Sequence, residues 1–350
     1  MLDSKSALPA LGAIGAIVAV LILGFGWARG WLGPTRVSGA AIADALEGNA
    51  GKHAGHRRAH AKGMCVTGYF DSNGNGRKVS TATVFKPGRY PVVGRFSLGG
   101  GNPLARDGRN VFHALALRIV TPDRQEWRLA MDHTDIFPVA TPQAFVALQK
   151  ASTPLPATGQ PDPAVMKAYL AEHPETKAFQ DYMKTNPLPG SFATGPYHSI
   201  NAFRFTDAQA QHRFVRWSFQ PEASGPLLDK ANLNDLPKDF LFDEMKARLK
   251  QGPVAWRMVV TLAAPDDVTD NATVRWPAGR RQLETGRLVI DRAEPQSGDA
   301  CRDLNFDPTV LPPGIAISDD PLLAARAAAY SASFTRRAGE TPPPSNGAHS

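Results

Sequence analysis

Two residues near the C-terminus, Arg326 and Tyr330, have the types and spacing of a metal-binding pair. They stand four positions apart in an alanine-rich run, and on a helix that spacing places both side chains on one face. A neighbouring cation stabilises the ionised form of a phenol, so the arginine favours a tyrosinate. A tyrosinate oxygen can bind ferric iron, and tyrosine is one of the residues that hold haem iron from the proximal side.

A second candidate for chemistry, His60, lies far upstream within the basic run at residues 57–63. An imidazole that titrates near neutrality can take up a proton and give it back. Splitting a peroxide needs both steps, because one oxygen loses a proton and the leaving oxygen gains one. A histidine and a tyrosinate on opposite sides of an iron would therefore form a peroxide-splitting site. Taken alone, each motif also fits a plainer role, as a surface histidine or as a packed helical tyrosine.

The elements that must position these residues read as a β-protein with helices. Alternating or β-branched runs bounded by Gly, Pro, Asn or Asp are typical of antiparallel strands. They occur at residues 65–70, 78–85, 92–98, 111–120, 127–131, 197–205, 212–219, 254–262 and 281–290. Helices are expected at residues 37–46, 142–150, 163–186, 238–250 and 319–337. The pattern predicts an α+β fold, with a closed antiparallel barrel of about eight strands surrounded by helices.

The charge of the chain bears on its partners. A net charge of +7 and a pI near 9.5 come from basic residues that are scattered along the sequence, so nucleic acid is not a predicted partner. Scattered arginines can still converge in the fold on carboxylates, such as the propionates of a haem. The two cysteines, Cys65 and Cys301, match no metal-binding spacing. They either pair in an oxidising compartment or remain two unrelated buried thiols.

The N-terminal segment is the candidate for membrane attachment. Residues 7–28 carry no charge, and at a rise of about 1.5 Å per residue they are long enough to cross a bilayer. A cleaved signal peptide is the alternative, but its apolar region is usually shorter. We expect an uncleaved anchor at residues 1–32, a haem domain at residues 33–338 and a disordered tail at residues 339–350. The anchor would hold the protein at the periplasmic face of the inner membrane.

Several segments resemble, in the same order along the chain, those of the haem catalases and in particular the small catalase-related peroxidases. Residues 57–63 resemble the distal histidine motif, and residues 94–97 resemble the strand with a propionate-binding arginine. Residues 131–137 fall where the family has a Gly-Asn-Asn-Thr type of segment, and residues 306–330 resemble the proximal stretch. The resemblance covers about residues 50–337. It implies a catalase-like fold with haem b between the barrel wall and the C-terminal helix.

The resemblance also implies roles for individual residues. His60 is expected to be the distal acid–base residue, with Ser97 as the hydrogen-bond partner of its far nitrogen. Tyr330 is expected to be the proximal iron ligand, kept anionic by Arg326. The residues expected to hold the rest of the haem are three propionate-binding arginines and one distal aromatic residue: Arg57, Arg95, Arg337 and Phe145.

The sequence departs from the family pattern at Asp132, where catalases have an asparagine. An asparagine donates a hydrogen bond without adding charge, whereas an aspartate donates only when it is protonated. Burial in an apolar pocket would raise its pKa and favour the protonated form. A local shift of the chain that turns His133 toward the haem is the alternative. Both cases disfavour full dismutation and favour a peroxidase cycle.

The predicted function is therefore haem-dependent reduction of hydrogen peroxide or an alkyl hydroperoxide by an unidentified organic electron donor, with weak catalase activity. One alternative is an enzyme that rearranges fatty hydroperoxides. A second is a non-catalytic, membrane-tethered haem carrier or sensor, which Asp132 favours. A third is a ligand-binding barrel without metal.

Overall fold

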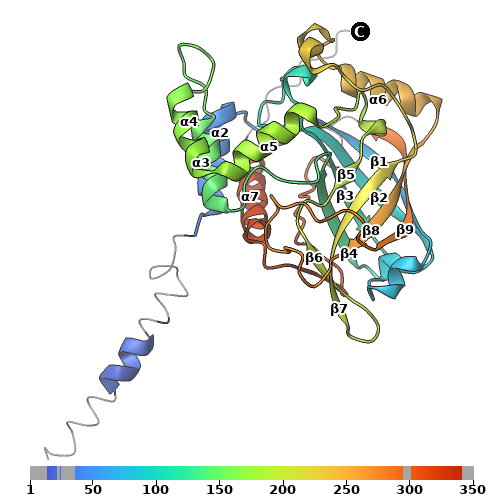
Figure 1. The fold of residues 1–350 in the computed structure, drawn as a ribbon. Coiled ribbons are helices and arrows are strands. Elements are labelled where there is room, and N and C mark those ends of the chain that lie inside the picture. Colours follow the sequence, from blue (N-terminus) through green and yellow to red (C-terminus); the bar gives the residue numbers. More distant parts are fainter. Residues whose placement is uncertain (1–13, 22–23, 25–35, 295–300, 341–350) are drawn as a thin grey trace, which may run out of the picture. The chain divides into compact units, whose positions relative to one another are not determined.

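A computed structural model describes residues 14–21, 24, 36–294 and 301–340 (Figure 1). The chain divides into a small unit, Met1–Ser38, and a large unit, Gly39–Ser350, which contains the barrel and the helices around it. Most of the expected anchor and tail lies outside the described residues. In the part of the chain that is described, no helix combines the length and the apolar character needed to cross a membrane.

Eight antiparallel strands close into a barrel, which confirms the expected fold class. In order around the ring they are β1 (Gly63–Ser72), β2 (Gly88–Leu98), β3 (His113–Val120), β4 (Glu126–Asp132), β5 (Tyr197–His198), β7 (His212–Pro221), β8 (Val254–Leu262) and β9 (Gln282–Glu294). Strand β9 pairs with β1 and so closes the ring. The short strands β6 (Phe203–Thr206) and β10 (Ile315–Ile317) extend the sheet beside β7.

The interior of the barrel is filled by large apolar side chains. Phe96 stacks on Phe192 with ring centroids 5.2 Å apart, and Trp256 lies 5.8 Å from Phe96. Trp127 and Tyr197 are also fully buried in this cluster. Alternate residues of a strand point to opposite faces of the sheet, so the residues between these point out of the barrel. Any ligand site on the barrel wall therefore lies on its outer surface.

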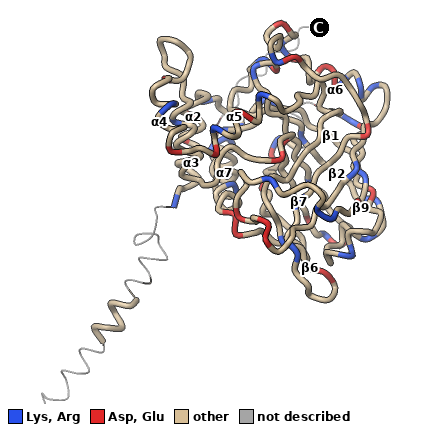
Figure 2. Tube along the Cα trace, viewed as in Figure 1, with Lys and Arg blue, Asp and Glu red and all other residues tan. Residues whose placement is uncertain are grey.

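Six helices of the large unit pack beside the barrel. They are α2 (Gly39–Ala50), α3 (Pro142–Ala151), α4 (Pro163–Glu172), α5 (Pro174–Thr185), α6 (Phe240–Gln251) and α7 (Pro321–Ala338). Four of them, α3, α4, α5 and α7, begin at a proline, which suits the first turn of a helix. At α7 the side chain of Asp320 accepts a hydrogen bond from Leu322 N, which caps the helix. A side chain at Gly39 would collide with the backbone of Ala328, so α2 and α7 pack closely. Basic and acidic residues are interspersed over the large unit (Figure 2).

Three of the expected elements are wrong in detail. Residues 78–85 do not form a strand: Lys78 ends one 3-10 turn, Asn75–Lys78, and a second turn covers Thr83–Phe85. Apolar side chains of this segment, such as Val84 and Phe85, pack into the core from these turns. The expected helix at residues 163–186 is two helices, because Pro174 has no N–H for the helix and clashes with the preceding turn. The expected strand at residues 197–205 is broken by Ile200, whose φ is +42°.

Candidate functional site

The outward residues of β2, β3 and β4 form a surface that we call the platform: Arg95, Ser97, Ala114, Ala116, Ala130 and Asp132. Strand register sets it out in two rows. Ser97 pairs with Ala114, which pairs with Asp132, and Arg95 pairs with Ala116, which pairs with Ala130. The three alanines leave the middle of the platform free of bulky side chains. Helix α7 reaches its edge, where Arg326 Nη2 donates to Ala130 O at 3.1 Å.

His60 lies at the Ser97 end of the platform. Its Nδ1 is 3.4 Å from Ser97 Oγ, so the expected partnership of these residues is present in the fold. Burial lowers the pKa of His60 to about 4, and the positive charges of Arg95, Arg326 and Arg57 add to the effect. At neutral pH the imidazole is therefore uncharged and able to accept a proton.

The backbone around His60 requires specific residues. The φ of His60 is +53°, in the left-handed region that residues other than glycine seldom adopt. The next residue is fixed by two hydrogen bonds, from Ala61 N to Gly100 O at 3.0 Å and from Arg95 Nη2 to Ala61 O at 3.1 Å. A side chain at Gly63 would collide with the guanidinium of Arg95. The glycine at the end of the histidine motif therefore makes room for an arginine of the platform.

Three arginines, Arg57, Arg95 and Arg337, lie close enough to perturb one another. Burial lowers the pKa of Arg57 well below its ordinary value, and the charges of Arg95 and Arg337 lower it further. Burial and the charge of Arg337 together lower the pKa of Arg95 to about 9. Asp303 is the carboxylate that acts against this effect at Arg57 and Arg337. The arginines thus leave positive charge that two carboxylates of a ligand would neutralise.

The phenol of Tyr330 raises the pKa of both Arg57 and Arg95, so Tyr330 lies close to these two arginines. Its ring packs against the cluster formed by Cys65, Cys301 and Phe306. The two cysteines form a disulfide with Cα atoms 5.9 Å apart, which answers the question that the sequence left open. A single phenol oxygen is a poor site for a bare ion, but it suits an iron that brings four nitrogen ligands of its own. The donor set of this region therefore fits a haem.

Arg326 makes contacts that the sequence did not reveal. Its Nη1 donates to Asn201 Oδ1 at 2.6 Å, and Asn201 Nδ2 donates to Asp320 Oδ2 at 2.8 Å. Asn201 is fully buried beside the strand-breaking Ile200. No motif surrounds Asn201, and its partners lie more than a hundred residues away, so sequence reasoning had no signal for it.

The register places Asp132 on the platform, whereas His133 turns away from it. His133 Nδ1 accepts a hydrogen bond from His113 N at 3.2 Å, and the His113 ring lies 5.4 Å from that of Phe192 inside the barrel. Asp132 is half-buried, and desolvation raises its pKa to about 6, against a smaller opposing effect of Arg326. Asp132, and not His133, is therefore the residue on the platform at the position where catalases have an asparagine.

Phe145 belongs to a separate group of side chains. Its ring stacks on Phe137 with centroids 6.1 Å apart, in an apolar cluster that includes Leu322 of α7. The other expected site residues meet one another through hydrogen bonds, register or electrostatic effects. The described contacts of Phe145 join it to α7, not to His60 or Tyr330.

Comparisons with known proteins agree with this geometry. The Catalase family profile matches residues 28–342. A catalase-related peroxidase of Synechococcus elongatus is 36% identical over 320 residues, which cover 91% of this chain and 94% of the relative. A catalase-related peroxidase of Mycolicibacterium paratuberculosis is 32% identical over 297 residues, covering 85% and 93%.

Solved structures show the same fold. A fungal catalase superimposes with a TM-score of 0.73 at 19% identity, over 81% of this chain and 60% of the fungal chain. A bacterial catalase gives a TM-score of 0.72 at 20% identity, over 87% and 62%. The chain thus spans about three fifths of the length of these solved catalases. The profile match, which covers most of the chain, and the two relatives above 30% identity show that this protein belongs to the catalase family.

Proposed function

We propose that this protein is a haem-dependent peroxidase. It reduces hydrogen peroxide or an organic hydroperoxide with two electrons from an organic donor, giving water or an alcohol. The observation that carries the proposal is a neutral His60 held by Ser97 on a platform that includes Arg95. Arg57, Arg337 and Tyr330 lie close enough to Arg95 for their charges to interact with it. The names of the two relatives, catalase-related peroxidase, support the same reaction class.

The cofactor that fits best is haem b. Both cysteines are used in the disulfide, so neither is available for a thioether bond to a haem vinyl group. Tyr330 would bind the iron, with Arg326 one turn earlier on the same helix. The propionates would be held by Arg57, Arg95 and Arg337 through paired charge-assisted hydrogen bonds. Phe145 would contact the haem edge from α3.

The haem, when bound, supplies the redox chemistry of peroxide reduction. The chain supplies the proton transfers. With Nδ1 engaged by Ser97, Nε2 is the nitrogen of His60 that can take the proton from one peroxide oxygen and deliver it to the leaving oxygen. Because the imidazole is neutral at working pH, it is ready to accept that proton without a prior ionisation.

Asp132 sets the balance between reduction and dismutation. Its raised pKa of about 6 leaves it mostly ionised at neutral pH. An ionised carboxylate cannot donate a hydrogen bond to a peroxide. Dismutation requires a second peroxide to be held and oxidised, so it is weak, whereas a bulky organic donor does not depend on this contact.

The absorption spectrum of the purified protein loaded with hemin is the decisive experiment. We expect a one-to-one complex with the spectrum of a ferric tyrosinate haem, which oxidises guaiacol when peroxide is added. Tyr330→Phe should lose tight haem retention. Tyr169→Phe is the matched control, because this tyrosine of α4 donates to Ala144 O away from the platform. A protein that binds no hemin, or a Tyr330→Phe variant with the parental spectrum, would overturn the assignment.

We also propose that the N-terminal segment anchors the protein to a membrane, with the haem domain outside the cytoplasm. The uncharged run at residues 7–28 and the Cys65–Cys301 disulfide support this location, since disulfides persist in oxidising compartments. The full chain should stay with carbonate-washed membranes, and a variant without residues 1–32 should become soluble. A full-length chain in the soluble fraction would contradict the anchor.

A further inference from the structure

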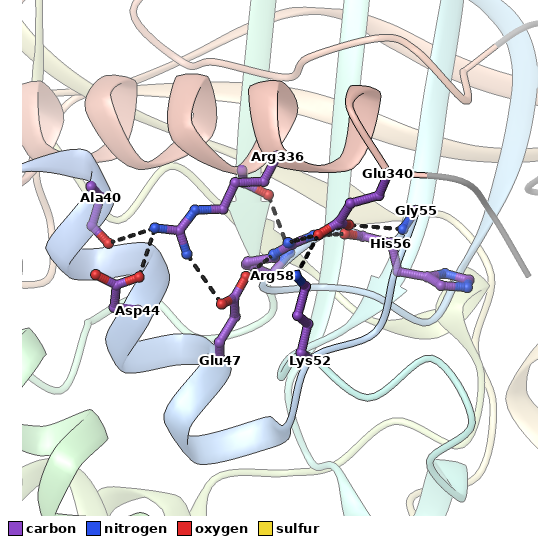
Figure 3. A network of polar contacts seen from close by, with 10 residues as sticks. Ala40, Asp44, Glu47, Lys52, Gly55, His56, Arg58, Arg336 and Glu340 are labelled. Atoms are coloured by element: carbon purple, nitrogen blue, oxygen red, sulfur yellow. Dashed lines mark hydrogen bonds and ion pairs between the residues drawn. The ribbon is translucent and has the colours of Figure 1, made fainter.

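Arg58 is adjacent to Arg57 in the sequence, but its side chain lies in a different environment (Figure 3). Nη2 donates to Glu340 Oε1 at 2.6 Å, and Nη1 donates to Glu340 Oε2 at 2.9 Å. Nε donates to Glu47 Oε1, and Nη1 also donates to His56 O at 2.9 Å. Only 2% of the Arg58 side chain is exposed. The guanidinium is therefore buried and paired with two carboxylates, and we call these three residues, Arg58, Glu47 and Glu340, the clamp.

The clamp joins three segments that are far apart in the chain. Glu47 comes from α2, Arg58 from the loop that leads to His60, and Glu340 from the residues just after α7 (Figure 3). The loop is tied again where Gly55 N donates to Glu340 Oε2 at 2.9 Å and Arg58 N donates to Ser333 Oγ at 3.1 Å. The loop is thus fixed to α7 through backbone and side chain together.

Two consecutive arginines anchor the loop to different partners. Arg57 Nη2 donates to Cys301 O at 3.0 Å and to Leu304 O at 2.9 Å, toward the region of Tyr330. Arg58 points to the clamp. Because both side chains are held, the backbone between them has little freedom to rotate. Only Ala59 separates this fixed point from His60.

His60 needs such support because its backbone conformation is unfavourable. A non-glycine residue with a φ of +53° persists only where its surroundings determine the conformation. On the C-terminal side the support comes from Ala61 N, which donates to Gly100 O. On the N-terminal side the clamp is the anchor nearest in sequence. Without it, the residue would relax and its imidazole would leave the position over Ser97.

We propose that Arg58 is a positioning residue for His60. Its ion pairs with Glu47 and Glu340 hold the loop that leads to His60, so that the imidazole remains in place for proton transfer. This inference rests on the proposed function, in which His60 moves the proton. A displacement of about 1 Å in a catalytic group can cost on the order of a hundredfold in rate. The effect of losing the clamp should therefore appear in proton transfer before it appears in haem binding.

Cyanide binding by the full chain loaded with hemin tests the proposal directly. Hydrogen cyanide must lose its proton as it binds to ferric haem, so its association rate reports a correctly placed base. Arg58→Gln should bind one hemin per chain as the parent does. Its cyanide association should be about ten- to a hundredfold slower, and kcat for peroxide should fall by a similar factor with little change in KM.

Two further variants keep the test decisive. Glu340→Gln leaves Arg58 paired with Glu47, so it should fold readily and show a smaller slowing of cyanide association, of about three- to tenfold. Arg248→Gln is the matched control. It removes an arginine of α6 that pairs with Glu244 at 2.6 Å, and neither residue belongs to the clamp. Its cyanide association should remain close to the parental rate.

The outcomes separate the two proposals. A parent that takes up no hemin would overturn the proposed function and this inference with it. Folded, haem-loaded Arg58→Gln and Glu340→Gln variants that bind cyanide at the parental rate would overturn the positioning role alone. The same would follow if Arg248→Gln slowed cyanide association as much as Arg58→Gln, since the effect would then reflect general stability. If Arg58→Gln does not fold, Glu340→Gln decides the question.

Discussion

The inward and outward side chains of strands β2, β3 and β4 differ in size and in charge. Inward residues such as Phe96 and Leu115 are large, apolar and completely buried. Their outward neighbours, Ser97 and Ala116, are small. The inward face holds the barrel together by close packing, whereas the outward face leaves room beside α7.

This difference shows how one strand can serve stability and chemistry at once. The side chains of a strand alternate with a period of two, so each successive residue can be chosen for a different purpose. This arrangement depends on strand register, because a slip of one residue would exchange the inward and outward side chains. The packed interior sets the register of these strands, and the register in turn fixes the positions of the platform residues.

Replacing His60 by alanine should have the largest effect on the outward face. Peroxide turnover should fall by about 10²- to 10⁴-fold, because the proton must then move without a positioned base. Haem binding should be retained, since Tyr330, and not His60, is the proposed iron ligand. In the parent, the pKa of about 4 predicts activity that holds steady from neutral pH and falls only as pH approaches 4, where the imidazole becomes protonated.

His173→Ala is the control for losing a histidine, because His173 lies between α4 and α5 and pairs with Glu175. It should keep the parental turnover and pH profile. Turnover that survives in His60→Ala, or an acid limb near pH 6.5 in the parent, would remove His60 from the proton transfer.

Two adjacent residues of β3 allow a direct test of the contrast between faces. Leu115→Ala opens a cavity inside the barrel and should lower the free energy of unfolding by about 2–5 kcal/mol. Its folded fraction should still bind haem. Ala116→Leu adds bulk to the platform and should abolish haem binding, while the unfolding transition of the apoprotein changes little.

Urea unfolding gives the free energy of unfolding of both variants, and hemin titration gives their haem affinities. The faces would not be separable if Ala116→Leu lowered stability as much as Leu115→Ala. A haem affinity unchanged by Ala116→Leu would show that the haem does not lie over the platform.

Much of the division between the inward and outward faces of the strands could be predicted from the sequence. Alternating runs such as residues 92–98 and 127–131 predicted strands that the structure contains, because period-two patterning is a local property. The meeting of His60 and Ser97 followed from the resemblance to the catalases, as did the grouping of Arg57, Arg95 and Arg337. Those parts depended on recognising ordered motifs rather than on periodicity.

Other parts could not be predicted, for physical reasons. Asn201 and Arg58 work through partners such as Asp320 and Glu340, which are brought near only by the closed barrel and by the packing of α2 on α7. Residues 78–85 have the apolar content of a strand, yet they form turns because their side chains close one end of the core. Local patterning cannot distinguish a buried turn from a short strand.

The smallest predicted effect concerns Asp132, whose burial makes the outward face sensitive to pH. Asp132→Asn supplies a neutral donor at the same place and should raise oxygen release from hydrogen peroxide by about tenfold at pH 7.5, since an ionised aspartate cannot donate there. In the parent, oxygen release should rise as pH falls through about 6, because the carboxyl becomes protonated, and the variant should lack this step.

Stability provides an independent check on the same residue. A carboxyl whose pKa is raised by folding binds its proton more tightly in the folded state, so the parent should lose stability as pH rises from about 4 to about 6. Asp132→Asn should show a flatter dependence over that range. Equal pH dependence in parent and variant, for both oxygen release and unfolding, would mean that Asp132 is ionised throughout and that another residue limits dismutation on this face.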